Sequence, residues 1–220
     1  MNSLRRKLLT AAASSACASL ALPALASSRR ALAAMTDGPF YPPGRWRENG
    51  PLKGDWDADL TRVERAGRVQ TARGEHLGLQ LRLADSKDRV VDNALIEVWQ
   101  CDVQAQYRHP SVELSDGAYD PGFQGFGAAR SGADGAVLMR TIRPVPYPGR
   151  TPHIHIKIRH ASLGEVTSQL FVAGDAGNPR DSLWRALPEA QRSSQDMRLQ
   201  ASSGANGLRW TAEHVLVFPA

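Results

Sequence analysis

The sequence predicts an all-β protein: a single β-sandwich domain with an irregular N-terminal arm and little helix. Several short segments alternate apolar and polar residues with a period of two, which is the pattern of strands with one buried face. Turn-forming clusters of Gly, Pro, Asp and Ser separate these segments, as they do between the strands of a sandwich. A length of 220 residues suits one compact domain with extensions.

The elements follow from these patterns in chain order. An arm over Met35–Trp56 is rich in Pro, Gly and aromatic residues, which indicates ordered but irregular structure and not a helix. The alternating segments predict strands at Leu77–Leu83, Ala94–Trp99, Ala136–Ile142, His153–Lys157, Val166–Val172 and His214–Phe218. A short helix is expected only in Asp181–Ser193. Core positions are expected for Trp99, Trp184 and Trp210.

The formal net charge of +5 comes from the beginning of the chain. The first 34 residues contain five basic residues and no acidic one, and the remaining 22 basic residues balance 22 acidic residues. No later basic tract is interleaved with aromatic residues. Nucleic acid is therefore not expected as a partner.

Residues 1–34 are expected to be an export signal. A short polar segment ends in the pair Arg5-Arg6, and an uncharged run of mostly small residues follows over Leu8–Ala26. Cleavage is expected after Ala26 or after Ala33, which leaves a catalytic domain over 35–220. The arginine pair favours the twin-arginine route to the periplasm. An uncleaved membrane anchor is the alternative, but the scarcity of large apolar side chains disfavours it, and no stable membrane association is expected after cleavage.

Cysteine usage restricts the chemistry of any metal site. Cys17 lies in the leader, so Cys101 is the single cysteine of residues 35–220. An intramolecular disulfide and a thiolate-rich zinc site are therefore excluded there. Any metal must be held by nitrogen and oxygen ligands.

The most distinctive motif lies in Pro146–Ile158. Residues two apart on a strand point to the same face, so His153 and His155 project together and the intervening isoleucines face the core. Such a histidine pair alone is weak evidence for a metal. Tyr147 and Arg150 strengthen it, because a turn constrained by Pro and Gly holds both just before the strand and a tyrosinate is a hard donor suited to iron(III).

The chain resembles the intradiol ring-cleavage dioxygenases, and most of all the protocatechuate 3,4-dioxygenase type. The resemblance covers most of Thr36–Asp175, in the family's order and at plausible spacing. The matching segments are Thr36–Pro43, Asn93–His109, Phe123–Arg130, Gly135–Ile158 and Ser168–Asp175. Together they are far more specific than any one motif.

The resemblance implies an iron(III) cofactor and a set of site residues. The ligand positions of the family match Tyr107, Tyr147, His153 and His155. Catalytic roles are implied for Tyr147, Arg150 and Gln169. The other tyrosines and histidines that we considered are expected to be structural or exposed; they are Tyr41, Tyr119, His76, His109, His160 and His214.

The implied reaction is the opening of a catechol-type ring by O2 to give a muconate-type diacid. Tyr147 would accept a substrate proton, and the Arg150 cation would stabilise negative charge on the ring. The expected partners are a small catecholic substrate and O2, and a homo-oligomer is possible.

The sequence departs from the family pattern between Tyr147 and Arg150. Only Pro148 and Gly149 separate them, whereas the corresponding segment of familiar members is longer and carries a tryptophan of the substrate pocket. We therefore expect a shorter and more open pocket rim and do not carry over protocatechuate as the substrate. Catechol, hydroxyquinol and a larger substituted catechol stay open.

Two other functions fit the same fold class. One is a sandwich that binds a metal without catalysis, or binds copper or zinc at His153 and His155; two tyrosinates favour iron(III) over both metals. The other is an adhesion or carbohydrate-binding module in which Tyr107 and Tyr147 contact the ligand. It predicts a protein without bound metal or colour.

Overall fold

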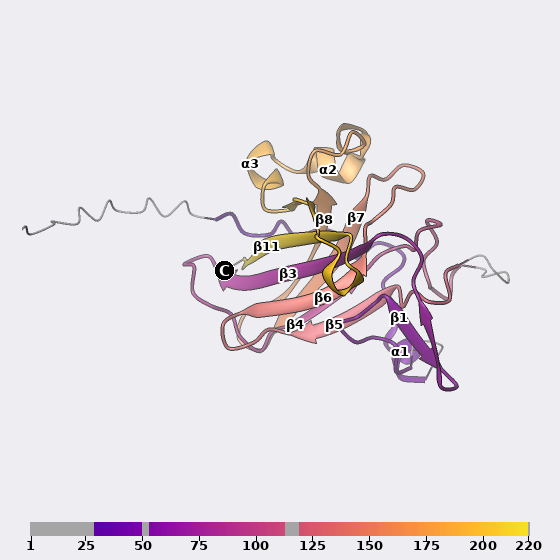
Figure 1. Ribbon diagram of the computed structural model, residues 1–220. Coiled ribbons are helices and arrows are strands. Elements are labelled where there is room, and N and C mark those ends of the chain that lie inside the picture. The colour runs from indigo at the N-terminus through magenta and orange to yellow at the C-terminus, as the bar shows by residue number, and fades with distance from the viewer. Residues whose placement is uncertain (1–28, 50–52, 113–118, 220) are drawn as a thin grey trace, which may run out of the picture.

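The computed structural model describes residues 29–49, 53–112 and 119–219. Strands dominate this part of the chain, which confirms the predicted all-β class (Figure 1). The strands are β1 (Arg62–Arg65), β2 (Arg68–Thr71), β3 (His76–Asp85), β4 (Leu95–Trp99), β5 (Phe126–Arg130), β6 (Ala136–Ile142), β7 (His153–His160), β8 (Gly164–Val172), β9 (Asp196–Met197), β10 (Gln200–Ala201) and β11 (Trp210–Phe218). The helical segments are α1 (Gly44–Asn49), η1 (Asn178–Arg180), α2 (Ser182–Ala186), α3 (Glu189–Arg192) and η2 (Ala205–Gly207).

Two sheets form the sandwich. One has the strand order β10-β11-β3-β6, and the other has the order β5-β4-β7-β8-β9. In Figure 1 the first sheet lies in front of the second, and α2 and α3 gather at one end. The pairs β11–β3 and β8–β9 are parallel, while the other pairs within the two sheets are antiparallel. The hairpin β1–β2 is separate from both sheets.

The core lies between the two sheets and follows from the period-two alternation. The isoleucines of β7 and the leucines of β3 are buried in one apolar cluster. Burying an isoleucine side chain stabilises the fold by about 1.5–3 kcal/mol relative to leaving it exposed. The alternation therefore fixes which face of β7 points outward, and this is the face that carries His153 and His155.

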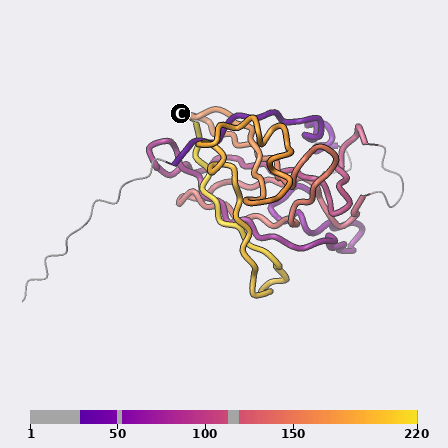
Figure 2. The backbone as a smooth tube through the Cα atoms, turned by 90° about the horizontal axis from the view of Figure 1, so that it is seen from above, coloured from indigo at the N-terminus to yellow at the C-terminus, as the bar shows by residue number. Residues whose placement is uncertain are grey.

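The N-terminal arm covers this outward face of the second sheet. Met35 donates its amide to the Thr167 carbonyl at 2.8 Å, and Lys157 Nζ contacts Asp37 Oδ2 at 2.7 Å. Seen from above, the indigo N-terminal segment runs along the molecule beside the orange segments (Figure 2). Polar residues of the sheet thus become buried although they face away from the sandwich core.

Three details differ from the expected elements. The arm contains a short helix, α1, so the prediction that it holds no helix is wrong for this turn; Pro43 starts it by accepting hydrogen bonds from the amides of Trp46 and Arg47. Trp99 is fully buried, whereas Trp184 and Trp210 are only half-buried. Both of these indoles lie beneath an arginine, Arg192 and Arg143 respectively, and Trp210 also packs against the core cluster.

The expected helix near the C-terminus is present in two short pieces. Asp181 caps α2, since its carboxylate accepts hydrogen bonds from the amides of Leu183 and Trp184. Pro188 follows α2 and precedes α3, which separates the two pieces.

The expected export signal falls mainly outside the described residues, which begin at residue 29. The end of that segment is described, and it is packed against the domain. Leu32 is 3% exposed, and its amide donates to the Val217 carbonyl at 2.9 Å. In the part of the chain that the structure covers, no helix has the length and apolar character needed to cross a bilayer.

Candidate metal and catalytic site

Four aromatic side chains predicted as metal ligands lie together at one end of the second sheet. The ring centroids of His153 and His155 are 5.0 Å apart. Tyr147 lies 5.4 Å from His153, and Tyr107 lies 6.2 Å from His155. The two tyrosine rings are 5.9 Å apart and perpendicular. The fold thus brings Tyr107 next to His155, although the two residues are 48 positions apart in the sequence.

Tyr107 is placed by a turn that follows β4. Asp102 organises this turn, because its Oδ1 accepts hydrogen bonds from the amides of Gln104 and Gln106. Ala105 adopts a left-handed conformation with φ of 61°, which costs a residue with a side chain about 1–2 kcal/mol. The tight turn directs Tyr107 back over the sheet, where the ring is 5% exposed.

Tyr147 and Arg150 are placed by the turn between β6 and β7. Their backbones pair across Pro148 and Gly149, and the Arg150 amide donates to the Tyr147 carbonyl at 2.9 Å. Proline followed by a glycine with φ of 80° is the arrangement of a type II turn. The short connection therefore brings the two side chains together, with Arg150 Nη1 3.5 Å from Tyr147 Oη.

The two histidines are oriented by their neighbours. His153 Nδ1 contacts the Thr151 carbonyl at 2.6 Å, so this nitrogen carries the proton and Nε2 presents a lone pair. His155 stacks on Trp99 with ring centroids 4.8 Å apart, and its cross-strand neighbours are Trp99 and Gln169. Both histidines are 2% exposed.

Buried polar atoms without a hydrogen-bond partner concentrate around this site. Native proteins pair nearly all such atoms, so a cluster of them calls for an explanation. Within the described residues, those at this site are Trp99 Nε1, Tyr107 Oη, His153 Nε2, His155 Nδ1 and Gln169 Nε2. Each of them lies on, or beside, the outward face of the second sheet.

Burial sets the protonation of the same side chains. It lowers the pKa of His153 to about 4, with the Arg150 cation adding to the effect. It also lowers the pKa of His155 well below 6.5, with a further contribution from His153. Both imidazoles are thus neutral near pH 7, which is the form that binds a metal.

Burial has the opposite effect on the two phenols. It raises the pKa of Tyr107 well above 10, and the neighbouring Tyr147 raises it further. It also raises the pKa of Tyr147, although the Arg150 cation offsets part of this rise. A phenolate at either position therefore needs a strong positive charge beside it.

This donor set fits ferric iron. The two imidazoles are neutral, and His153 Nε2 and Tyr107 Oη are buried without partners. Two tyrosinates supply hard anionic oxygens, which a trivalent ion would stabilise against their burial. Cys101, which packs against Tyr107, is no competing ligand because burial raises the pKa of its thiol to about 12.

Arg150 is held beside the four rings by two further residues. Its Nε donates to Asp181 Oδ2 at 2.8 Å, and its Nη2 donates to Gln169 Oε1. The structure thus brings predicted Arg150 and Gln169 together with the predicted ligands. Asp181 is a site residue that the sequence reasoning missed, and its only sequence signal is its position before a short helix.

The N-terminal arm forms the roof of the site. Phe40 stacks on Tyr107 with ring centroids 4.4 Å apart. Gly38 passes directly over His155: a Cβ on this glycine would lie 3.4 Å from the His155 Cε1, and its φ is 70°. A residue with a side chain is disfavoured there by its conformation. The arm thus shields Tyr107 and His155 from water.

The tyrosines and histidines expected to be structural or exposed either have hydrogen-bond partners of their own or are partly exposed. Tyr41 donates to Glu97 Oε2 at 2.8 Å. His76 and His214 each use Nε2 to contact a backbone carbonyl at 2.9 Å. His109 is buried and bonds Ser111 at 2.7 Å, whereas Tyr119 and His160 are partly exposed.

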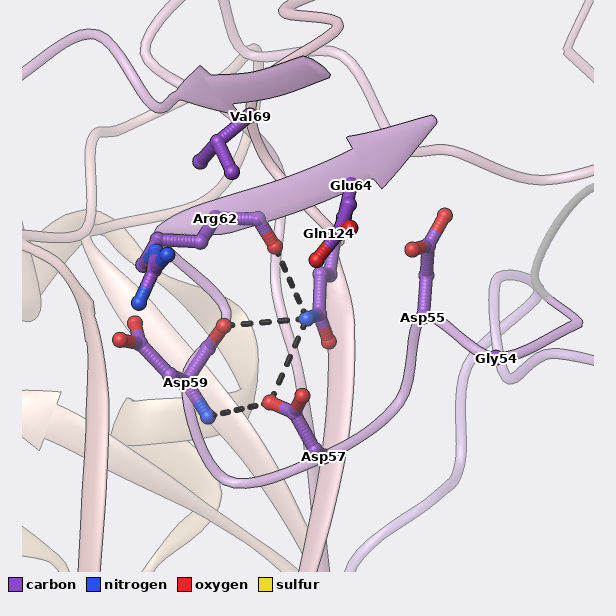
Figure 3. A pocket seen from close by; sticks show the side chains of 8 residues that line it. All are labelled: Gly54, Asp55, Asp57, Asp59, Arg62, Glu64, Val69 and Gln124. Carbon is purple, nitrogen blue, oxygen red and sulfur yellow. Dashed lines mark hydrogen bonds between the residues drawn. The ribbon is translucent and has the colours of Figure 1, made fainter. Parts of the chain in front are cut away.

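A second polar pocket lies beside the β1–β2 hairpin, away from these rings (Figure 3). Its carboxylates include Asp55, Asp57 and Asp59. The Gln124 amide nitrogen donates to Asp57 and to the carbonyls of Asp59 and Arg62. Across residues 29–49, 53–112 and 119–219, no group of three or more His, Cys, Asp or Glu side chains is arranged to hold a metal ion.

Comparison with known proteins identifies the family of the chain. Residues 48–216 match the dioxygenase family. The chain is 32% identical over 151 residues to the protocatechuate 3,4-dioxygenase beta chain of Burkholderia cepacia, with 65% of this chain and 61% of that protein covered. It is 27% identical over 138 residues to hydroxyquinol 1,2-dioxygenase of Corynebacterium glutamicum, with 53% and 43% covered. The chain therefore spans less than two thirds of either relative.

A solved structure supports the same fold. The dioxygenase domain of a dioxygenase and carbohydrate-binding protein fusion from Streptomyces sp. SirexAA-E superposes with a TM-score of 0.62 at 22% identity. The match covers 87% of this chain and 99% of that domain. Because the family match spans most of the sequence, the chain belongs to the intradiol ring-cleavage dioxygenases, a family of oxidoreductase enzymes.

Proposed function

We propose that this protein uses ferric iron and O2 to cleave a catechol-type ring between its two hydroxylated carbons, giving a muconate-type diacid. The observation that carries the proposal is the cluster of buried, unpartnered ligand atoms of Tyr107, His153 and His155, with Tyr147 beside them. Family membership supplies the reaction class.

The four predicted ligands, Tyr107, Tyr147, His153 and His155, would hold the iron. When bound, the ferric ion would act as a Lewis acid toward a catecholate and make its ring carbons reactive toward O2. Preorganisation of the ligands comes from the protein: Trp99 and Thr151 fix the two imidazoles.

Tyr147 serves as the base in this proposal. It is the more exposed of the two tyrosines and lines a cavity of about 340 Å³. A phenolate at Tyr147 Oη accepts the proton of a substrate hydroxyl. Arg150 favours this phenolate, because its cation opposes the effect of burial on the Tyr147 pKa.

Arg150 stabilises negative charge that develops on the ring. Its guanidinium is fixed by Asp181 and Gln169, so no reorganisation is needed as the charge grows. The roof made by Gly38 and Phe40 covers His155 and Tyr107 on the other side of the site and keeps water from these two rings.

The test combines colour, iron content and oxygen uptake on one purified sample. We expect a visible charge-transfer band from tyrosinate bound to ferric iron, near-stoichiometric iron and oxygen consumption with catechols. Tyr107→Phe should weaken the band and the activity. Tyr119→Phe, the same change at a tyrosine away from the rings, should alter neither.

Two results would oppose the proposal. A protein that stays colourless after loading with ferric iron would contradict the ligand set. Colour and iron without oxygen uptake on any catechol would leave a metal-binding sandwich without the proposed reaction.

We also propose export to the periplasm by the twin-arginine route, with cleavage after Ala26. Cleavage after Ala33 would remove Leu32, which is buried in the core and bonded to β11. Cleavage after Ala26 keeps this contact. The mass of the mature protein from a periplasmic extract decides between the two sites, and replacing Arg5 and Arg6 with lysines should block export.

A further inference from the structure

The cavity beside Tyr147 extends toward a second arginine. Its lining residues are Pro146, Tyr147, Gly149, Arg150, Thr151, Gly177, Arg180 and Asp181. A molecule that contacts Tyr147 and Arg150 therefore also has access to Arg180, at the end of η1. The proposed reaction gives Arg180 no role.

The two arginines of this cavity differ in their partners. Asp181 Oδ2 accepts hydrogen bonds from Arg150 Nε and the Thr151 amide, and its Oδ1 accepts two from the first turn of α2. Both oxygens are thus occupied, and the carboxylate balances the charge of Arg150. In the described part of the chain, the exposed Arg180 side chain forms no ion pair or hydrogen bond, so its guanidinium is available to a molecule bound in the cavity.

The segment that carries Arg180 is fixed relative to the Tyr147–Arg150 turn. The Arg180 amide donates to the Gly177 carbonyl at 2.9 Å. Asn178 is 3% exposed; its side chain donates to the Val172 carbonyl and accepts from Thr151 Oγ1 at 2.8 Å. A Cβ at Gly177 would lie only 2.8 Å from Thr151 Oγ1, so this close approach requires glycine. The backbone of Arg180 is therefore part of the wall of the site.

We infer that Arg180 determines substrate specificity by binding an anionic substituent, such as a carboxylate, on the catechol ring. This inference rests on the proposed function. A guanidinium presents parallel N–H donors that match the two oxygens of a carboxylate, and it keeps its charge at every physiological pH. The preferred substrate is thus a catechol with a negative charge outside the two hydroxyl groups.

The sharpest test compares 3,4-dihydroxybenzoate with 3,4-dihydroxybenzamide, which has the same ring without the charge. In oxygen-uptake kinetics, Arg180→Gln should raise KM for the acid about tenfold, as the loss of one partly exposed charge-assisted contact would. KM for the amide should stay unchanged, and kcat should change little, because the contact is the same before and during the reaction. Arg180→Lys should recover part of the affinity. Arg185→Gln, an exposed arginine on α2 outside the cavity lining, is the matched control and should resemble the wild type.

Equilibrium binding supplies a readout that does not depend on ring cleavage. Calorimetric titration with 4-hydroxybenzoate and 4-hydroxybenzamide, which lack the second hydroxyl group, should show weaker binding of the acid alone in Arg180→Gln. If this variant binds and cleaves acid and amide as the wild type does, the inference is overturned while the proposed function stands. If the wild type cleaves neither ring but binding of the acid still depends on Arg180, the anion site stands and the proposed function fails.

Discussion

The two ends of strand β7 bury polar side chains on the same face but treat them differently. At one end, the imidazoles of His153 and His155 retain buried nitrogen atoms without partners. At the other end, Lys157 pairs with Asp37, and Arg159 pairs with Glu97 and Glu165. The same arm covers both ends.

The difference distinguishes a binding site from a structural network. Buried charges are stable in a protein only when they are paired, and the Glu97 end meets this requirement: its carboxylate accepts from Arg47, Tyr41 and Arg159. The histidine end leaves donors and acceptors open in a place where water is excluded. That arrangement costs stability in the absence of a ligand and favours the binding of one.

The largest effect is expected from removing a ligand. His155→Ala should abolish iron binding and reduce ring cleavage by about 10⁴-fold or more, the scale of losing one member of a catalytic unit. Iron content and oxygen uptake measure both effects. His160→Ala, at the partly exposed end of the same strand, is the control and should keep iron and activity. If His155→Ala kept stoichiometric iron, the histidine end of β7 would not be a metal-binding site, and the contrast with the paired end would be lost.

Substitutions at the paired end of β7 should lower the free energy of unfolding instead of the activity. Glu97→Ala leaves Arg47 and Arg159 without their buried partner, and we expect a loss of about 3–5 kcal/mol in the free energy of unfolding. Urea unfolding measures this loss. Glu165→Ala, which removes a carboxylate that is 47% exposed, should cost about 1 kcal/mol or less. Equal losses in the free energy of unfolding for Glu97→Ala and Glu165→Ala would show that the buried network stabilises the fold no more than an exposed ion pair does.

A smaller effect is expected at Asp181, which lies outside the ligand set and positions Arg150. Asp181→Asn removes the charge that holds the guanidinium and should lower kcat about 10–100-fold, as the loss of an outer-shell partner does. Iron content and the visible band should persist. If Asp181 acts by positioning Arg150, kcat for the uncharged 3,4-dihydroxybenzamide should fall while its KM changes little. If Asp181→Asn also lost its iron, Asp181 would be needed for the structure of the whole site and not only for the position of Arg150.

The smallest expected effect is an acid-dependent contribution of the arm. Burial by itself raises the pKa of Asp37, but hydrogen bonds from Lys157 and Thr167 outweigh it, so the pKa lies below 3.8. Asp37 therefore stabilises the fold above pH 3.8, and this contribution is lost as the pH falls through the lower, folded-state value. Since Asp37 is partly exposed, we expect Asp37→Asn to remove about 1 kcal/mol or less. Unfolding measured between pH 3 and pH 7 should show the variant and the wild type converging at the acid end.

Alternation predicted the long strands well because burial on one face fixes their sequence. β7 and β3 are the best examples, with apolar residues at every second position. The hairpin β1–β2 and strand β5 were missed. Val63 is the only buried residue of the hairpin, and β5 contains Gly and Ala where large apolar residues would mark a strand. Their pairing depends on distant partners that no local pattern reveals.

The site was predictable to the extent that its residues lie in motifs. Strand alternation and the Pro/Gly turn pointed to His153, His155 and Tyr147, and the family resemblance added Tyr107. The structure brings the four side chains together. Asp181 and the roof formed by Gly38 could not be found this way. Their importance comes from contacts with Arg150 and His155, which are distant in sequence and exist only in the folded chain.

The pairing of β11 with β3 has a consequence for how the protein is made. β11 joins β3 in parallel over nine residue pairs, although about 130 residues separate the two strands along the chain. A nascent chain on the ribosome thus holds β3 with one open edge until Phe218 emerges, and such an edge invites pairing with other chains. Contacts of this range also slow folding. We therefore expect synthesis of this protein to depend on chaperones that shield β3 until the last strand arrives.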